Sequence, residues 1–481
     1  MTTTVPGTSP AEPILVIGNG PAAHQFVDRL RHVGLQDPVT ILGAEDAPAY
    51  HRALLTSALD GSLPPAAMEL PPPPGDTRVR TGVCAVRIDR AGRRVHTADG
   101  QALPYGLLVL ATGATPLLPN LPGLRTAGGA LAEGVATLRT LADCARLTDP
   151  AAVDARTPVT ILGAGSLGME AAFALAAKGR PVTLVHPGAW PMEHLLDRTA
   201  GALVTDRLVA AGVEVVTGRA ATAYAPDGLT LADGRTLPVD TLLVCTGVLP
   251  ETGLARAAGL SVRTGIVVDD CLRTDDPLIH ALGDCAEQRG RRGGSLASGW
   301  AQAEALARHL ATGERGVAPA RRVLRPRIAG PGLVVLGIPG GDPADEVITL
   351  NDPANTRYAR LEITGERIVA GVLLGFDRAI ASTTELYVHD LPVPRDRLSL
   401  LLGRAPRVAK PGSQELCPDT VVCLCNNVTH RDLTEAWHAG SREIPELAAA
   451  TRATTGCGGC TRQVEAICAS LASTTPAATG S

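Results

Sequence analysis

The strongest constraint on the fold is a pattern that occurs twice: an apolar strand, a glycine-rich turn and a helical segment. The first copy reads PILVIGNGPAAHQFVDRL, with a strand at Ile14 to Ile17 followed by Gly18-x-Gly20-x-x-Ala23. The first glycine permits a tight turn, the second lets the backbone approach a pyrophosphate, and the small third residue lets helix and strand pack closely. The next strand leads to Glu45, where an acid can bind a ribose hydroxyl. This copy predicts a dinucleotide-binding unit; the alternative is a glycine-rich turn that holds no ligand.

The second copy, PVTILGAGSLGMEAAFALAAKGRPVTLVH, has the complete motif Gly163-x-Gly165-x-x-Gly168, with Glu170 shortly after it. Its next strand ends at Val185-His186. An acid at that point favours NADH and an arginine favours NADPH, so His186 decides neither. Two such units in one chain predict two nucleotides, one of which can be a flavin. The predicted fold class is therefore α/β with two Rossmann-like dinucleotide-binding domains.

Composition narrows the remaining choices. The chain has 481 residues, enough for about three domains, and its net charge of −4 offers no basic face to nucleic acid or an anionic membrane. The N-terminal segment MTTTVPGTSPAE lacks the basic and apolar regions of a targeting signal, and no apolar run approaches the roughly 20 residues of a membrane span. With no such signal, the 11 cysteines predict a reducing, cytoplasmic location, where clustered cysteines are ligands more often than disulfides.

Three further segments end a strand on small or acidic residues. YGLLVLATGATPLLPNLPG ends an apolar strand at Ala111-Thr112-Gly113, VDTLLVCTGVLPET repeats this pattern, and GIVVDDCLRTDDPLIHALGDCAE ends a strand at Gly283-Asp284. Together with the two glycine motifs, their order resembles the pyridine-nucleotide–disulfide oxidoreductase superfamily of flavoproteins. The resemblance implies FAD in the first unit and NAD(P)H in the inserted second unit, with Asp284 near the FAD ribityl or pyrophosphate.

The resemblance also implies which residues bind. PAYHRALLTSAL resembles the superfamily's Tyr-x-Arg-x-x-Leu-Ser/Thr segment, which makes Arg52 and Thr56 flavin-site candidates; the alternative for Arg52 is a solvated surface arginine. Hydride transfer itself requires no acid or base, so we predict no catalytic proton donor. The residues implied to touch FAD are Gly18, Gly20, Ala22, Ala23, Glu45, Arg52, Thr56, Thr112, Gly113 and Asp284. The residues implied to touch the nicotinamide nucleotide are Gly163, Gly165, Gly168 and Glu170.

No redox-active thiol stands beside the predicted flavin site. The superfamily's disulfide reductases carry Cys-x-x-x-x-Cys on the helix after the early flavin loop, and other branches carry a single redox cysteine there. The corresponding segment YHRALLTSALDG contains neither. Cys84 and Cys144 stand alone and are expected to be ordinary core or surface thiols. Electrons must therefore leave the flavin by another route.

Four cysteines near the end of the chain offer that route. Cys423 and Cys425 form a Cys-x-Cys, and Cys457 and Cys460 form a Cys-x-x-Cys within TRATTGCGGCTRQV. The helical patterns between the pairs can bring four thiolates together, and the adjacent glycines let backbone N–H groups point at sulfur. Four thiolates suit a [2Fe-2S] cluster or a structural zinc, and the residue types alone leave both open, although zinc ribbons favour two Cys-x-x-Cys pairs.

The segment that contains these cysteines resembles the bacterioferritin-associated-ferredoxin-like [2Fe-2S] domain, including its TRATTGCGGC signature. Cys417 and Cys468 lie outside the pattern and are predicted not to be ligands. The resemblance implies a [2Fe-2S] cluster held by Cys423, Cys425, Cys457 and Cys460.

The predicted organisation is an FAD domain around an inserted NAD(P)H domain, then an α+β interface domain, a linker rich in Gly and Pro, and a small helical [2Fe-2S] domain. The interface domain is compatible with a homodimer. The predicted boundaries are 1–130 and 262–315 for the FAD domain, 131–261 for the NAD(P)H domain, 316–404 for the interface domain, 405–420 for the linker, 421–470 for the [2Fe-2S] domain and 471–481 for a disordered tail.

Over nearly its whole length the chain resembles the electron-transfer half of NAD(P)H-dependent assimilatory nitrite reductases and the electron-transfer subunit of assimilatory nitrate reductases. The resemblance implies an NAD(P)H-dependent oxidoreductase that passes electrons through FAD and the cluster to a partner. That partner is either a molybdenum-containing nitrate reductase subunit or a sirohaem nitrite reductase. The sirohaem region carries Cys-x5-Cys followed by Cys-x3-Cys, and the sequence stops before such a region, so we do not expect nitrite reduction by this chain alone.

Three alternatives stay open at this point. One is a reductase of ferredoxin or rubredoxin type that serves an oxygenase, with the tail as a built-in ferredoxin. Another is an iron-sensing or cluster-carrying module whose tail lies off the electron path. The third is an amine- or opine-oxidising flavoprotein subunit. The intact second dinucleotide motif argues against it, because such an enzyme need not bind NAD(P)H.

Overall fold

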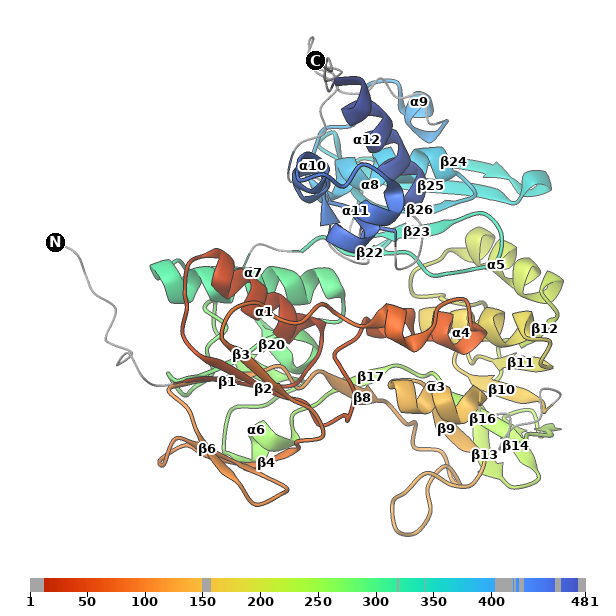
Figure 1. Cartoon of the computed structure of the whole chain (residues 1–481). Coiled ribbons are helices and arrows are strands. Elements are labelled where there is room, and N and C mark those ends of the chain that lie inside the picture. Colours follow the sequence, from red (N-terminus) through yellow and green to blue (C-terminus); the bar gives the residue numbers. More distant parts are fainter. Residues whose placement is uncertain are drawn as a thin grey trace.

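The structure, a computed structural model, describes residues 13–148, 157–317, 320–341, 343–402, 418, 421–423, 428–454 and 460–474. Two parallel sheets occupy the lower part of Figure 1, and an antiparallel sheet lies in the upper part together with the C-terminal helices. Within the described residues, no helix is both long enough and apolar enough to span a bilayer.

The first dinucleotide unit is built on a five-stranded parallel sheet with strand order β19-β7-β1-β2-β3. All four residues of the central strand β1 are buried, as expected where helices or other layers cover both faces of a parallel sheet. One strand, β19, comes from far along the chain, so this unit is discontinuous in sequence. The strands are β1 (Ile14–Ile17), β2 (Val39–Leu42), β3 (Thr77–Arg80), β7 (Leu107–Leu110) and β19 (Ile279–Ala281).

Helices α1 (Pro21–His32) and α7 (Leu296–Thr312) pack against each other and share a core with this sheet. Helix α1 begins with Pro21 directly after the glycine turn, where the missing N–H has no intrahelical partner to lose. The other elements of the unit are η1 (Arg52–Leu54), α2 (Leu55–Asp60), η2 (Pro65–Met68), β4 (Ala85–Asp89), β5 (Arg94–Thr97), β6 (Ala102–Pro104), α6 (Gly253–Ala257), β18 (Ile266–Val268), η3 (Gly283–Cys285), β20 (Ala286–Gln288) and β21 (Arg291–Arg292).

The second dinucleotide unit has its own five-stranded parallel sheet, with strand order β12-β11-β10-β16-β9. A small antiparallel sheet, β13-β14-β15, is attached to it. The elements are β9 (Val135–Thr137), α3 (Leu141–Thr148), β10 (Val159–Leu162), α4 (Ser166–Ala177), β11 (Val182–Val185), α5 (Arg198–Ala210), β12 (Val213–Val216), β13 (Ala221–Ala225), β14 (Gly228–Leu231), β15 (Thr236–Leu237) and β16 (Thr241–Val244).

The chain crosses between the two units twice, and the two crossings pair with each other. Strand β8 (Ala114–Pro116) runs antiparallel to β17 (Val248–Pro250). Next to this pairing, the N–H of Leu117 donates to the carbonyl of Gly247 at 2.9 Å, and the hydroxyl of Thr246 donates to the carbonyl of Leu117 at 2.6 Å. The crossings therefore form a two-stranded ribbon between the units.

The third domain is an antiparallel sheet with strand order β22-β23-β26-β25-β24, packed on one helix of three turns. This combination is the α+β architecture that the sequence predicts. Its elements are β22 (Val323–Leu324), β23 (Leu333–Leu336), β24 (Glu346–Asp352), η4 (Pro353–Asn355), β25 (Arg357–Thr364), β26 (Arg367–Leu374), α8 (Asp377–Val388) and α9 (Arg397–Leu401).

The C-terminal domain is small and mostly helical. Its core includes Trp437 and two cysteines, Cys423 and Cys460. The last helix ends at Thr474, beyond the predicted domain boundary at 470, and most of the predicted linker lies outside the described residues. The elements are β27 (Val421–Cys423), β28 (Val428–Thr429), α10 (His430–His438), α11 (Ile444–Thr451) and α12 (Thr461–Thr474).

Asp197 caps a helix of the second unit and also contacts the third domain. Substitutions at this position therefore test how much the cap and the domain contact stabilise the protein. Its carboxylate accepts the N–H of Ala200 at 3.0 Å as the N-cap of α5, and it accepts the hydroxyl of Tyr358. We expect Asp197→Ala to lower the free energy of unfolding by about 1–2 kcal/mol because the cap is lost. Asp197→Asn keeps a capping oxygen and should lose less than Asp197→Ala. Urea unfolding followed by circular dichroism measures both, and equal losses would contradict the capping role.

Candidate functional site

A cavity of about 2150 Å³ is lined by residues from both dinucleotide units. The glycine turns that follow β1 and β10 both contribute to it, so the carboxyl ends of the two parallel sheets face the same space. In open α/β sheets, ligands bind at this end of the strands. The cavity also reaches residues of the third and C-terminal domains, which makes it the meeting point of all four parts of the chain.

The glycines of both turns leave room for a phosphate. Gly18 has a φ of 115°, and a Cβ there would lie 2.0 Å from the carbonyl oxygen of Ala111. Gly163 has a φ of 108° and is similarly crowded. In contrast, a Cβ at Gly20 or Gly165 would meet no atom within 4 Å. Open space in front of a helix N-terminus fits a dinucleotide pyrophosphate, because the first N–H groups of a helix have no partner within the helix.

The third positions of the two motifs serve packing. Ala23 is fully buried, and a Cβ at Gly168 would lie 1.9 Å from the carbonyl oxygen of Gly163. Neither residue lines the cavity, whereas Ala22 does, and a Cβ at Gly283 would come within 3.2 Å of the Ala22 Cβ. Direct contact of Ala23 or Gly168 with a nucleotide stays a prediction, and their structural role is to let helix and strand approach.

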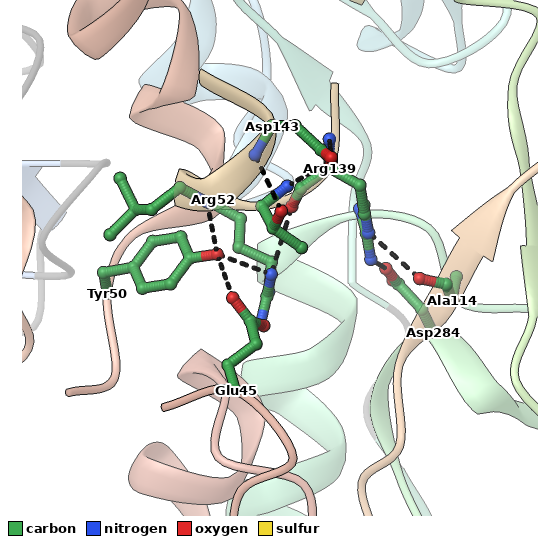
Figure 2. A network of polar contacts seen from close by, with 9 residues as sticks. Glu45, Tyr50, Arg52, Ala114, Arg139, Asp143 and Asp284 are labelled. Carbon is green, nitrogen blue, oxygen red and sulfur yellow. Dashed lines mark hydrogen bonds and ion pairs between the residues drawn. The ribbon is translucent and has the colours of Figure 1, made fainter. Parts of the chain in front are cut away.

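Glu45 and Arg52, both predicted to bind FAD, form an ion pair (Figure 2). The hydroxyl of Tyr50 donates to the Glu45 carboxylate at 2.7 Å, and Arg52 donates to the Tyr50 oxygen at 2.8 Å and to the carbonyl of Arg139 at 3.1 Å. Burial raises the pKa of Tyr50, so this hydroxyl remains a hydrogen-bond donor. Arg52 is thus held in place inside the cavity wall and is not a solvated surface arginine.

Asp284 is also paired with an arginine, which sequence reasoning did not find. The guanidinium of Arg139 lies 3.1 Å from the Asp284 carboxylate and donates to the carbonyl of Ala114 at 3.0 Å (Figure 2). The backbone N–H groups of Arg139 and Thr140 donate to Asp143 at 2.8 and 3.0 Å, which fixes the turn that presents the arginine. Carboxylates can accept hydroxyl groups of a ribose or ribityl chain, and guanidinium groups can donate to phosphate.

Thr112 and Gly113 follow β7 and line the cavity. The hydroxyl of Thr112 donates to the carbonyl of Glu251 at 2.7 Å, and the N–H of Glu251 donates to the carbonyl of Gly113 at 2.9 Å. The returning crossing of the chain therefore holds these two residues. If Thr112 or Gly113 contacts the flavin, the contact is made by backbone atoms, or the Thr112 hydroxyl must first leave the carbonyl of Glu251.

Thr56 and Glu170, predicted for different cofactors, contact each other. The hydroxyl of Thr56 donates to the Glu170 carboxylate at 2.9 Å. Arg327 of the third domain donates to the Thr56 hydroxyl, and its Nε lies 3.7 Å from the Glu170 carboxylate. Burial raises the pKa of Glu170, while the Thr56 hydrogen bond and the Arg327 charge act in the opposite direction. Sequence reasoning missed Arg327, which no local motif marks.

His186 lies at the end of β11, half-buried beside an acid. Its Nδ1 is 3.4 Å from the N–H of Ala164, and its Nε2 is 3.9 Å from the carboxylate of Glu193. Burial lowers the pKa of His186, so the imidazole is neutral at pH 7. Glu193 also accepts the N–H of Ala189 at 2.9 Å. An acid that the sequence pattern did not reveal therefore lies beside the end of β11.

Two of the four predicted cluster cysteines are described, and both line the cavity. Cys423 ends β27, Cys460 precedes α12, and both are buried in the core of the C-terminal domain. The N–H of Thr454 points at the Cys460 sulfur at 3.3 Å, which is how proteins stabilise a metal-bound thiolate. These features fit a sulfur-ligated cluster. Cys425, Cys457 and the predicted non-ligand Cys417 lie outside the described residues.

The three described cysteines that the sequence predicts not to be ligands have the surroundings of ordinary thiols. Cys84 is exposed, and Cys144 is buried with its sulfur 3.4 Å from the carbonyl of Leu55. Burial raises the pKa of Cys144 to about 12, so it does not act as a thiolate at neutral pH. Cys468, the second predicted non-ligand, lies on α12, and burial raises its pKa as well.

The two glycines of the second motif should respond differently to the same substitution. Gly165→Ala adds a methyl group to open space that a pyrophosphate would use, so we expect weaker NAD(P)H binding with stability nearly unchanged. Gly168→Ala places a methyl group against the Gly163 carbonyl, so we expect a lower melting temperature, equivalent to about 1–3 kcal/mol. Nucleotide titration and thermal melting separate the two effects. The reverse pattern would show that the roles are exchanged.

Comparison with family models agrees with this geometry. Residues 12–305 match the model "Pyridine nucleotide-disulphide oxidoreductase", and residues 421–470 match "BFD-like [2Fe-2S] binding domain". The predicted cofactors FAD, NAD(P)H and a [2Fe-2S] cluster, and the predicted fold class, are confirmed by these matches. Among solved structures, the chain is similar to the putidaredoxin reductase–putidaredoxin complex, with a TM-score of 0.71 and 26% identity over 81% of this chain and 95% of that chain.

Curated relatives match across both regions. The chain is 27% identical over 467 residues to "Nitrite reductase [NAD(P)H]" of Bacillus subtilis (strain 168), covering 94% of this chain and 57% of the relative. It is 29% identical over 471 residues to the "Assimilatory nitrate reductase electron transfer subunit" of the same organism, covering 94% of this chain and 59% of the relative. The chain thus spans less than two thirds of the length of either relative. Since the first family model covers more than half of its residues, the chain belongs to the pyridine nucleotide-disulphide oxidoreductase family, and it carries a BFD-like [2Fe-2S] domain at its C-terminal end.

Proposed function

We propose that this oxidoreductase delivers electrons from NAD(P)H, through FAD and the [2Fe-2S] cluster, to a partner reductase of nitrate or nitrite assimilation. The likeness to the two Bacillus subtilis proteins over 94% of the chain supports this reading. The partner with the stronger support is a molybdenum-containing nitrate reductase subunit, and a sirohaem nitrite reductase is the second. A homodimer and a cytoplasmic location stay predictions.

One observation carries the proposal: the two predicted cluster cysteines that the structure describes share a cavity with the predicted flavin site. Cys423 and Cys460 line the same cavity as Gly18, Arg52 and Asp284. A built-in electron acceptor requires this arrangement, because electrons then reach the cluster without leaving the protein. A regulatory or purely structural tail has no need to face the flavin site.

Different residues of the cavity would bind different parts of the two nucleotides. Gly18, Gly20 and the start of α1 would hold the FAD pyrophosphate, with Glu45 and Asp284 accepting hydroxyl groups of the cofactor. The second motif would hold the nicotinamide nucleotide in the same way. When bound, FAD accepts a hydride from NAD(P)H, and the [2Fe-2S] cluster carries electrons singly. The chain's own contribution is orientation of the two nucleotides, for which no proton donor is needed.

A second candidate function is reduction of a separate small electron carrier. The chain is 36% identical over 288 residues to the "Nitric oxide reductase FlRd-NAD(+) reductase" of Aeromonas salmonicida (strain A449), covering 71% of that protein. It is also similar to a "Ferredoxin Reductase for the CYP199A2 System" of Rhodopseudomonas palustris, with a TM-score of 0.71 and 27% identity. This candidate explains residues 12–305 but gives no role to cysteines that face the flavin site.

The first experiment is an anaerobic visible spectrum of the protein before and after addition of NADH and then NADPH. Flavin bands with extra long-wavelength absorbance, both bleached by a nucleotide, are the expected result. Flavin bands without that absorbance, together with zinc in metal analysis, would reduce the tail to a structural role and leave a simple flavin reductase.

Cys460 and Cys468 allow a matched test of the electron path. Both belong to the same core, but only Cys460 is predicted as a ligand. We expect Cys460→Ser to lose the cluster absorbance and transfer to the partner reductase, and to keep NAD(P)H-driven reduction of a dye that accepts electrons from the flavin. Cys468→Ser should keep all three. Transfer to the partner that survives in a cluster-free Cys460→Ser protein would exclude the cluster from the path.

The acid beside His186 predicts the choice of nucleotide. The Glu193 carboxylate would repel the 2′-phosphate of NADPH, and Arg219, in the segment after the neighbouring strand β12, is paired with Asp233 at 2.9 Å. We expect kcat/KM for NADH to exceed that for NADPH by about tenfold or more. Glu193→Gln should narrow this ratio, and Asp206→Asn, an exposed acid on α5, should not. A preference for NADPH in the unmodified protein would contradict the assignment.

A further inference from the structure

The third domain sends one arginine into the cavity of the two dinucleotide units. Arg327 lies in the loop between β22 and β23 and lines the cavity. Its guanidinium donates to the Thr56 hydroxyl on α2, and its Nε lies 3.7 Å from the Glu170 carboxylate on α4. A neighbouring arginine of the loop, Arg325, also lines the cavity but donates to Thr384 within its own domain.

Three parts of the chain therefore meet in one polar cluster. Thr56 comes from the first unit, Glu170 from the second and Arg327 from the third domain. Thr56 is 1% exposed, and the Glu170 side chain is 14% exposed. Since Thr56 is implied in flavin binding and Glu170 in nicotinamide binding, their contact marks the place where the two nucleotide subsites adjoin.

A carboxylate in this position needs a positive charge. Burial disfavours the ionised form, and an unpaired buried charge is strongly destabilising. The elements packed against α4 bring few charged groups, namely Asp60 at the end of α2, Glu214 on β12 and none on β10 or β11. Among the described residues, Arg327 alone forms an ion pair with Glu170.

We propose that Arg327 is a positioning residue of the hydride-transfer site, supplied by the third domain, which pairs with the Glu170 carboxylate and holds it with Thr56 where the two subsites adjoin. The third domain is then part of the redox site as well as a neighbour of it. This inference rests on the FAD and NAD(P)H sites proposed above, and it adds a residue that neither dinucleotide motif contains.

The alternative is that Arg327 only fastens the third domain to the units. Arg207 on α5 provides the matched control, because it fastens the same domain without touching a cavity carboxylate. Its guanidinium donates to the carbonyls of Pro331 at 2.6 Å and Thr356 at 3.2 Å. Arg207→Gln and Arg327→Gln thus both remove an interdomain arginine, and only the second leaves Glu170 without its cation.

The test follows the flavin absorption spectrum of the oxidised, FAD-loaded protein between about pH 5.5 and 9, without nucleotide. Loss of the cation moves the pKa of Glu170 upward, so Arg327→Gln should show a spectral transition with the protonated carboxyl on the acid side. In the unmodified protein, Arg207→Gln and Arg327→Lys, any such transition should lie at a lower pH than in Arg327→Gln. The double variant Arg327→Gln/Glu170→Gln should show none. At pH values below this transition, flavin reduction by NADH in Arg327→Gln should be slower than in the unmodified protein by about tenfold to a hundredfold.

The following outcomes would overturn the proposal. A flat titration in Arg327→Gln means that Arg327 does not control Glu170. A transition that persists in the double variant belongs to another group, and the same transition in Arg207→Gln reports loosening of the third domain. If the unmodified protein is not reduced by NADH or NADPH, the proposed function fails first, and that result is visible before any variant is made.

Thermal melting covers the case in which Arg327→Gln is too unstable for the titration. The buried Glu170 carboxylate, left without its partner, should lower the melting temperature of Arg327→Gln, and its removal in the double variant should restore part of that loss. A double variant that is no more stable than Arg327→Gln would contradict the pairing.

Discussion

The site depends on one constraint, the common direction of strands in a parallel sheet. All carboxyl ends of such a sheet lie along one edge, and both sheets of this chain present that edge to the same cavity. Three of the acids that line this cavity are each paired with an arginine. The ion pairs are Glu45–Arg52, Asp284–Arg139 and Glu170–Arg327. The cavity can therefore hold charged nucleotides while these three carboxylates stay compensated.

The parts of the fold and site that sequence predicted are those encoded locally. A strand, a glycine turn and a helix are adjacent in the chain, so their residue spacing carries the geometry of Gly18 and Gly163. The cysteine pairs are local in the same sense. In contrast, Arg139 meets Asp284 across 145 positions, and Arg327 meets Thr56 across 271. No neighbouring residues record such contacts, because the fold alone brings the partners together.

Local patterns also leave the role of a residue partly undecided. The third positions of both motifs, Ala23 and Gly168, face the interior, and the adjacent Ala22 faces the cavity. Likewise, the spacing of the cysteines predicts a cluster but does not say which way it faces. The burial of Cys423 and Cys460 at the cavity wall supplies that direction, and it is a property of how the C-terminal domain packs on the others.

The ribbon of β8 and β17 has a consequence for how such a chain can change over time. The two crossings between the units are hydrogen-bonded to each other, residue against residue from Ala114 to Pro116 and from Val248 to Pro250. A residue inserted into one crossing shifts its register against the other unless a bulge absorbs it, so an insertion in one crossing alone disrupts this pairing. Insertions in the outer loops leave this pairing intact, whereas the length of the two crossings between the nucleotide sites is constrained by it.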